Sequence, residues 1–200
     1  MIDARLVELG GRRIASRSID NRIGAWVVLE TLRVLAEDGD AVRAQVSAVA
    51  TAQEEIGYQG GGARTSAFAL EPDIAIVVDV TFASDVPGIE KKQVGEHKLG
   101  GGPVLGRGSA SHPGMFERLA ETAEAEGIPY TVEARPKQTS TDADAIHVVR
   151  RGVATANISV PNRYMHSPNE VVSLDDLDAT VQLIAAFCRG LSPDVDFTRA

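Results

Sequence analysis

Four carboxylates and one histidine, spread over most of the chain, are the residues best suited to do chemistry. Glu54 and Glu55 stand side by side after an alternating apolar run, and Asp79 stands at the end of a second apolar run. Asp20 precedes the first helical pattern, and His166 follows a third apolar run. Carboxylates and an imidazole together form a ligand set that suits Zn²⁺, Co²⁺ or Mn²⁺. If folding brings them together, these residues predict a metal-binding site.

The adjacent glutamates set a physical problem, because like charges that share a site repel and one carboxylate then has a raised pKa. A cation offsets that repulsion, so that one of Glu54 and Glu55 can bind metal while the other handles a proton. Each residue also has a simpler explanation: an exposed loop for the glutamates, a helix N-cap for Asp20, a turn contact for Asp79 and packing for His166. The metal-site hypothesis therefore depends on the five residues as a group.

Hydrophobic periodicity predicts the elements that must position these side chains. A helix is expected at 22–37, with an apolar stripe broad enough for burial on two sides, and a strand at 42–51. The run DIAIVVDV at 73–80 is apolar on both faces, which is typical of a central parallel strand. The other expected elements are helices at 62–69, 113–126, 142–150 and 174–190, strands at 130–134 and 153–160, one or two short strands within residues 1–19, and a loop at 83–112.

The alternation of strands and helices predicts an α/β fold with a mostly parallel sheet flanked by helices. In open α/β sheets, ligands bind at the carboxyl ends of the strands. Glu54, Glu55, Asp79 and His166 all lie at or after the ends of expected strands, and the dipole of the first helix favours a carboxylate such as Asp20 at its N-terminus. A parallel sheet would therefore carry all five side chains at one edge.

Composition narrows the possible partners. The 200 residues carry a formal net charge of −8, which argues against nucleic acid or an anionic membrane as a partner. The single cysteine, Cys188, excludes an internal disulfide and is expected on the buried face of the last helix. The first residues show neither a signal peptide nor a spanning segment, so we expect a cytoplasmic protein.

Five motifs give the sequence a family resemblance that covers residues 5–190. In order along the chain they are SIDNRIGAWVVLE, TAQEEIG, DVTFASDVPG, STDADAIHVVRRGV and VPNRYMHSPNEVVSLDDL. Their order and spacing resemble those of the tetrahedral (TET) aminopeptidases, which include glutamyl, leucyl, lysyl and deblocking aminopeptidases. Some members of that family carry an endoglucanase name.

The resemblance implies a zinc-exopeptidase-like fold and a hydrolase, a metalloprotease that removes N-terminal residues from peptides with two divalent ions, Zn²⁺ or Co²⁺. It implies that Asp20 bridges both ions, that Glu55 and His166 complete one metal site, and that Asp79 belongs to the other. Glu54 would be the general base that activates the metal-bound water.

The resemblance also implies a cis peptide bond at Asp20–Asn21 and a homo-oligomeric assembly. Family members have a preceding strand region with a further histidine ligand, and a β-rich dimerisation insert, and neither is found in this sequence. We therefore expect residues 1–200 to be a partial catalytic domain, truncated at the N-terminus, in which residues 1–19 are the connection from that insert. The second metal site then keeps only Asp20 and Asp79, because no ligand role is expected for the remaining histidines, His97, His112 and His147.

Two other functions are weighed against the aminopeptidase. A non-catalytic or weakly active metal-binding relative or subunit would have no need of the base Glu54. A glycoside hydrolase could use Glu54 and Asp79 as a carboxylate pair, but that chemistry leaves Asp20 and His166 unexplained. The glycine runs at 60–62 and 100–102 lack the Lys-Ser/Thr of a phosphate-binding loop and are expected to be turns.

Overall fold

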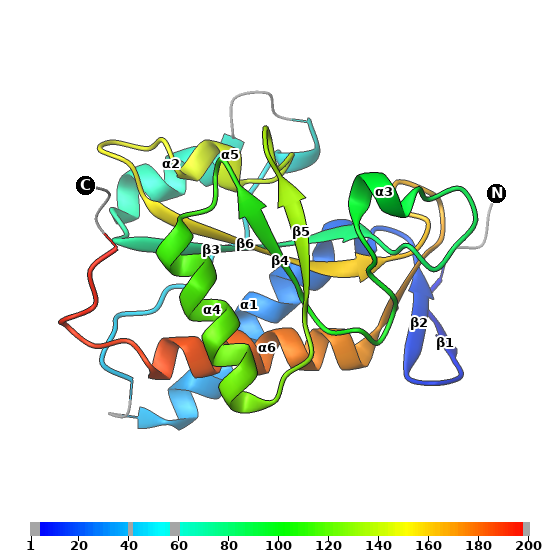
Figure 1. The fold of residues 1–200 in the computed structure, drawn as a ribbon, viewed down its shortest axis with the longest axis horizontal. Helices are drawn as coiled ribbons and strands as arrows, with labels where there is room; N and C mark the ends of the chain where they lie inside the picture. The colour runs from blue at the N-terminus through cyan, green and yellow to red at the C-terminus, as the bar shows by residue number, and fades with distance from the viewer. Residues whose placement is uncertain (1–4, 40–41, 57–60, 198–200) are drawn as a thin grey trace.

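The computed structural model describes residues 5–39, 42–56 and 61–197. Its strands form two sheets (Figure 1). The larger sheet has the order β3-β6-β4-β5, with β3 (Ile74–Phe82), β6 (Ala154–Asn162), β4 (Val104–Gly108) and β5 (Thr131–Arg135). The pairs β3–β6 and β4–β5 are parallel, whereas β4 and β6 are antiparallel. The smaller sheet is antiparallel and joins β1 (Val7–Leu9), β2 (Arg13–Ser16) and β7 (Glu170–Ser173).

Helices cover both faces of the larger sheet, which confirms the predicted α/β class. The helices α1 (Ile19–Glu37), α4 (Pro113–Glu126) and α6 (Leu174–Arg189) lie on one face, and α2 (Gly61–Leu70) and α5 (Ala143–Ile146) lie on the other (Figure 1). The short helix α3 (Lys91–Val94) and the 3₁₀ turn η2 (Glu54–Ile56) complete the elements of the described chain.

The main core lies between the larger sheet and the layer of α1, α4 and α6. Its largest fully buried side chains include Phe187 and Leu183 of α6, Leu119 of α4 and Ile158 of β6. The predicted bounds of α4 are confirmed, because Pro113 opens the helix and Gly127 closes it with a positive φ of 66°. Ser173 is the N-cap residue of α6, as expected.

Three predictions for these elements were wrong. The segment 83–112 contains β4, a strand whose Gly106 and Gly108 give it little strand character, although both glycines allow close approach of neighbouring chain. The helix expected at 142–150 is only α5, four residues long. The helix α1 is buried on one side only, since Trp26 and Leu29 on its other side are 45% and 55% exposed.

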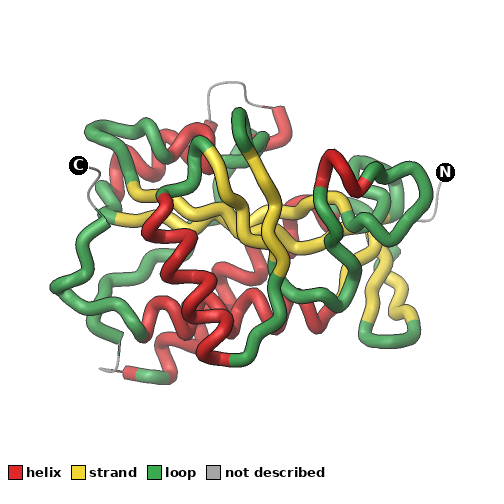
Figure 2. The backbone as a smooth tube through the Cα atoms, in the orientation of Figure 1, coloured by secondary structure: helices red, strands yellow, loops and turns green. Residues whose placement is uncertain are grey.

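The segment at 42–51 also differs from its prediction. Residues 42–48 keep the expected alternation of half-buried and exposed side chains, but the segment pairs with no strand among the described residues and is drawn as loop (Figure 2). In the same way β3, expected at the centre of the sheet, lies at its edge. Periodicity reports which side chains are buried, whereas a strand also requires a neighbouring chain for its backbone hydrogen bonds.

The glycine run at 100–102 forms a turn, as expected. Gly100 and Gly102 have positive φ angles, and their N–H groups donate to the two oxygens of Asp176 at 2.8 and 2.7 Å. In the other run, Gly61 and Gly62 begin α2, and Gly60 lies outside the described residues. Within the described chain, no helix is long and apolar enough to cross a membrane.

Candidate metal centre

Asp20 lies in the first turn of α1, just after β2, where Asp20 and Asn21 have non-helical backbone angles and form a loop that two side chains hold. The Asp20–Asn21 peptide bond is cis, as expected. The Asn21 side chain donates to the carbonyl of Val78 at 2.8 Å and so joins the loop to β3. On the other side, Glu170 accepts hydrogen bonds from the N–H of Asp20 at 3.2 Å and from that of Ile19 at 2.7 Å. The loop is therefore fixed from both sheets, and Asp20 does not act as an N-cap, because Ser18 occupies that position.

His166 lies in the turn between β6 and β7, and the same Glu170 holds this turn. The N–H of His166 donates to Glu170 Oε1 at 3.3 Å, and Asn162 at the end of β6 donates to the same oxygen at 3.1 Å. Glu170 is only 2% exposed. Sequence reasoning missed this residue, although a glutamate at the start of an apolar run, four positions after His166, was a signal that could have found it.

Asp20, Glu55 and His166 meet in space, and each offers a ligand atom within 4.8 Å of the others. His166 Nε2 lies 3.1 Å from Asp20 Oδ2 and 3.7 Å from Glu55 Oε2. The Asp20 side chain is 8% exposed, whereas those of Glu55 and His166 are 49% and 65% exposed. The cluster therefore has a buried base and opens to solvent on one side.

Glu54 and Asp79 lie beside this cluster and not within it. Glu54 and Glu55 share the single turn η2. Asp79 was expected at the end of its strand, but it lies inside β3, three positions before the last residue. Its Oδ1 accepts a hydrogen bond from the N–H of Val80 at 2.8 Å, and its charge interacts with those of Asp20 and Glu54.

The electrostatics of the site indicate that its carboxylates, if all were ionised, would repel one another in a partly buried space. Burial, reinforced by the charge of Glu55, raises the pKa of Asp20 to about 7. Burial raises the pKa of Asp79 to about 8, against the opposing effect of its hydrogen bond from Val80. The pKa of Glu54 is also raised, first by burial and then by Glu55. A divalent cation would relieve this repulsion, so the donor set fits a metal ion in both chemistry and charge.

Asp142, to which sequence reasoning gave no role, holds the segment of chain that carries the glutamate pair. Thr51 Oγ1 donates to Asp142 Oδ2 at 2.5 Å, which joins the segment just before η2 to the start of α5. Burial raises the pKa of Asp142, and the hydrogen bond from Thr51 opposes that effect. Asp142 also lies close enough to Glu54 to raise the pKa of that carboxylate.

The other histidines have structural roles. His97 is 1% exposed, and its ring nitrogens lie 2.7 Å from Thr131 Oγ1 and 2.6 Å from the carbonyl oxygen of Val94. His147 Nδ1 lies 2.8 Å from the carbonyl oxygen of Ala143, one turn earlier. His112 is the N-cap residue of α4. Within the described chain, His166 is the one histidine in a cluster of metal-ligand type.

An α/β sheet that gathers carboxylates and a histidine at one edge has the donor set of a possible metal site. Comparison with known proteins identifies the family of this chain. The family model for M42 glutamyl aminopeptidases matches residues 1–183, and the chain belongs to this family.

Curated relatives and solved structures agree with this assignment. The chain is 40% identical to lysyl aminopeptidase of Pyrococcus furiosus over 190 residues, which are 95% of this chain and 52% of that protein. It is 30% identical to glutamyl aminopeptidase of Lactococcus lactis, over 94% of this chain and 51% of that protein. A TET aminopeptidase from a marine-sediment thaumarchaeon superposes with a TM-score of 0.87 at 30% identity, over 96% of this chain and 53% of the other. The chain thus spans about half the length of the relatives it matches.

Proposed function

We propose that this chain carries the water-activating part of a metal-dependent aminopeptidase, which removes N-terminal residues from peptides. The observation that carries the proposal is the meeting of Asp20, Glu55 and His166 within 4.8 Å, in a member of an aminopeptidase family. The names of the relatives, lysyl and glutamyl aminopeptidase, support the reaction class. The proposal makes residues 1–200 a partial catalytic domain.

Asp20, Glu55 and His166 would hold one divalent ion, for which Zn²⁺ and Co²⁺ suit a set of two carboxylates and an imidazole. When bound there, such an ion supplies a Lewis acid that polarises the substrate carbonyl and lowers the pKa of water. Asp20 and Asp79 would contribute to a second ion. Two protein ligands are fewer than the three of a typical catalytic zinc site, so this chain alone would hold the second ion weakly.

In this proposal Glu54 would move the proton. It shares the η2 turn with the ligand Glu55, so its carboxylate lies beside the proposed ion without having to bind it. Burial raises its pKa, which moves the group toward the range in which a general base works best near neutral pH. In the proposed reaction the carboxylate takes a proton from the attacking water and delivers it to the amine that leaves.

The remaining expectations belong to the same proposal. A Pyrococcus horikoshii TET1 peptidase, 27% identical, can assemble into a tetrahedron or an octahedral shell. We propose that the protein to which this chain corresponds also forms a homo-oligomer, acts on peptides and works in the cytoplasm. Nucleic acid and membranes are not proposed as partners, given the net charge of −8.

The first test measures bound metal per chain by elemental analysis after dialysis against Zn²⁺ or Co²⁺. The wild-type chain is expected to bind at least one ion, and His166→Ala is expected to lose it. The matched control is His147→Ala, because that ring contacts the carbonyl of its own helix turn and belongs to no cluster of metal-ligand type among the described residues. A folded wild-type chain that binds no metal would contradict the proposal.

Activity gives the second readout. Release of the N-terminal residue from lysyl and glutamyl peptides should disappear with a chelator and with Glu54→Gln, while Glu54→Gln should keep its metal. Hydrolysis of a β-glucan that persists in the chelator would favour the glycoside hydrolase in place of the aminopeptidase.

A further inference from the structure

The turn between β6 and β7 aims the ring of His166 through its backbone. The side chain of His166 is 65% exposed, and no hydrogen bond from the described residues reaches its Nδ1. Histidines that bind metals usually have the direction of the ring fixed by a partner at the second nitrogen. Because His166 has no such partner in the described chain, the direction of its Nε2 toward Asp20 depends on the path of the turn.

That path is unusual, because two of its residues have left-handed backbone angles although neither is a glycine. Tyr164 and His166 have φ angles of 62° and 61°. Such angles are unfavourable for residues with a side chain, so the surrounding contacts must maintain them. The N–H of Ser167 donates to the carbonyl of Tyr164 at 3.0 Å, and the side chain of Met165 packs against the main core. The position of His166 therefore depends on what anchors the turn.

Besides Glu170, a second anchor holds the start of the turn. The guanidinium of Arg163 donates two hydrogen bonds to the carboxylate of Asp85, from Nε at 2.9 Å and from Nη2 at 2.6 Å. The backbone of Arg163 exchanges hydrogen bonds of 2.9 and 3.0 Å with that of Val171. Two parallel hydrogen bonds between a guanidinium and a carboxylate fix direction as well as distance. Arg163 therefore fixes the chain three residues before His166.

Asp85 can serve as an anchor because it is itself held in place. It lies just after β3, in the connection to β4, and also accepts a hydrogen bond from the N–H of Leu99 at 3.3 Å. Next to it, the N–H of Ser84 donates to the carbonyl of His97 at 2.6 Å, and the N–H of His97 donates to the hydroxyl of Ser84 at 2.9 Å. Both of these residues are buried. The turn of His166 is thus joined to a firmly held part of the connection.

The ion pair is partly buried, which makes it more important than an exposed one. The side chains of Arg163 and Asp85 are 23% and 19% exposed. Burial alone would raise the pKa of Asp85, but the hydrogen bonds and the charge of Arg163 outweigh burial and lower it. Exposed ion pairs contribute little to stability. Breaking a partly buried pair has a larger effect, because the remaining charge is left without its partner.

We propose that Asp85 and Arg163 are positioning residues for the candidate metal centre, because together they set the path of the turn and so aim His166 at the ion. Neither residue contacts the ion in this proposal, and both act through the backbone before His166. The inference deepens the proposed function and rests on it, since it requires that His166 binds a metal.

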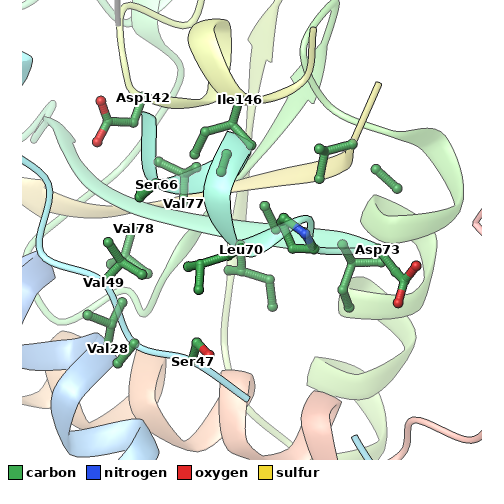
Figure 3. A pocket seen from close by; sticks show the side chains of 18 of the residues that line it. Val28, Ser47, Val49, Ser66, Leu70, Asp73, Val77, Val78, Asp142 and Ile146 are labelled. Atoms are coloured by element: carbon green, nitrogen blue, oxygen red, sulfur yellow. The ribbon is translucent and has the colours of Figure 1, made fainter. Parts of the chain in front are cut away.

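The pair is separate from the open side of the site. A large groove lies along β3 and reaches Glu54 and Glu55. Leu70 and Val77 are among the apolar side chains around it (Figure 3). Neither partner of the ion pair is among the described residues that line this groove. A substitution in the pair therefore leaves the lining of the groove unchanged, and a loss of metal affinity would report on His166.

The test measures the dissociation constant for Zn²⁺ by competition with a chromogenic chelator. Arg163→Ala and Asp85→Ala should each weaken binding by about 10–100-fold, which is typical when a residue that orients a metal ligand is removed. The double variant should bind about as weakly as the weaker single variant, because the two residues act as a unit. Arg163→Lys keeps the charge but loses the paired geometry, and its affinity should fall between those of the wild type and Arg163→Ala.

A second ion pair provides the control. Arg189 at the end of α6 lies 2.8 Å from Asp38, the C-cap residue of α1, and neither residue belongs to the metal-ligand cluster. Arg189→Ala should keep the wild-type affinity for Zn²⁺. Thermal unfolding of the metal-free chains shows that each variant folds.

The absorption spectrum of bound Co²⁺ gives a readout that a loss of stability alone would not change, because it depends on the number and geometry of the ligands. With saturating Co²⁺, Arg163→Ala should change the spectrum and Arg189→Ala should keep it. Wild-type affinity and spectrum in folded Arg163→Ala and Asp85→Ala would overturn the role of the pair and leave the proposed function intact. A loss of affinity in Arg163→Ala that Asp85→Ala does not share would overturn it too. A wild-type chain that binds no metal would overturn both proposals.

Discussion

The two sides of the candidate metal centre are built differently. The closed side consists of β6, β7 and α6 with the loops that carry Asp20 and His166, and the open side consists of residues 42–56, α2 and the outer edge of β3. On the closed side all nine positions of β6 are buried. On the open side the first three residues of β3 are only half-buried, and a groove of about 2400 Å³ lies beside them.

The difference shows how one site can be partly preorganised. Glu170 holds the segments of Asp20 and His166 together in the closed side through two buried and two partly buried hydrogen bonds. On the open side, the chain before Glu54 and Glu55 is held by the hydrogen bond from Thr51 to Asp142 and by one from the N–H of Gly62 to the carbonyl of Ala52 at 2.8 Å. The closed side should therefore dominate the stability of the chain, and the open side should control where the two glutamates lie. Four predictions test this division.

The largest difference is expected from two equivalent truncations, one on each side. Leu183 of α6 is 0% exposed and Leu70 of α2 is 53% exposed. Leu183→Ala should lower the free energy of unfolding by about 2–5 kcal/mol, because it leaves a cavity in the core. Leu70→Ala should change it by less than about 1 kcal/mol. Denaturant unfolding measures both, and equal losses would show that the open side is as tightly packed as the closed one.

Removal of Glu170 should come next. Its carboxylate accepts hydrogen bonds from the N–H groups of Ile19, Asp20 and His166 and from Asn162. Glu170→Ala leaves these donors without an acceptor and should cost about 3 kcal/mol of the free energy of unfolding. Metal affinity should fall as well, because both loops lose their common anchor.

The control for this change is Glu170→Gln, which keeps one acceptor oxygen. It should lose less stability and less metal affinity than Glu170→Ala. If Glu170→Ala unfolds at the wild-type denaturant concentration, Glu170 does not hold the closed side together.

The pH dependence of stability tests the closed side at Asp176, a residue that is not part of the metal-ligand cluster. Burial raises the pKa of Asp176 to about 6, against the hydrogen bonds from Gly100 and Gly102; the carboxylates of Asp175 and Asp85 add to the increase. Between pH 3.8 and about 6 the folded chain keeps a proton that the unfolded chain has lost. The contribution of Asp176 to stability is therefore present below that range and is lost as the pH rises through it.

Asp176→Asn cannot titrate, so its stability should fall less steeply with pH over this range than that of the wild type. The maximum difference in slope for one proton is about 1.4 kcal/mol per pH unit. Denaturant unfolding at several pH values measures it, and identical slopes would mean that Asp176 is ionised throughout.

The smallest effect on stability is expected on the open side. Thr51→Val removes the hydrogen bond to Asp142 and should cost about 1 kcal/mol of the free energy of unfolding. The loss of peptidase activity should be larger than this small loss of stability suggests, because this hydrogen bond helps to fix the chain that leads to Glu54 and Glu55. Thr65→Val, at an exposed hydroxyl of α2, is the control and should leave metal affinity and peptidase activity unchanged. Unchanged activity in Thr51→Val would show that the glutamate pair is held in another way.

Much of the fold could be predicted because it follows from local patterns. The bounds of α4 and α6 follow from amphipathic stripes that end at Gly127 and begin after Ser173. The strand β6 follows from a run in which small apolar and polar residues alternate, as in Ala154, Thr155, Ala156 and Asn157. The strand β4 was missed because its glycines remove the strand signal, and its place between β5 and β6 depends on partners distant in the sequence.

The candidate site divides in the same way. Asp20, Glu55 and His166 were expected to meet from their residue types and their places at element ends, and the structure brings them together. The roles proposed for them and for Glu54 and Asp79 remain predictions. The roles of Glu170 and Asp142 were not foreseen, although both residues lie within the quoted motifs, because each acts by binding a segment that is remote in the chain.

The sequence by itself determined the residue types of the site, most of the helices and strands, and the resemblance to a family, since motifs and periodicity are properties of neighbouring residues. Only the tertiary structure decided that one buried carboxylate joins the loops of Asp20 and His166. It also decided that β3, apolar on both faces, lies at an edge, and that residues 42–50 pair with no strand of the described chain. The physical reason is that backbone pairing and burial at a distance depend on what lies beside each segment, which no local pattern records.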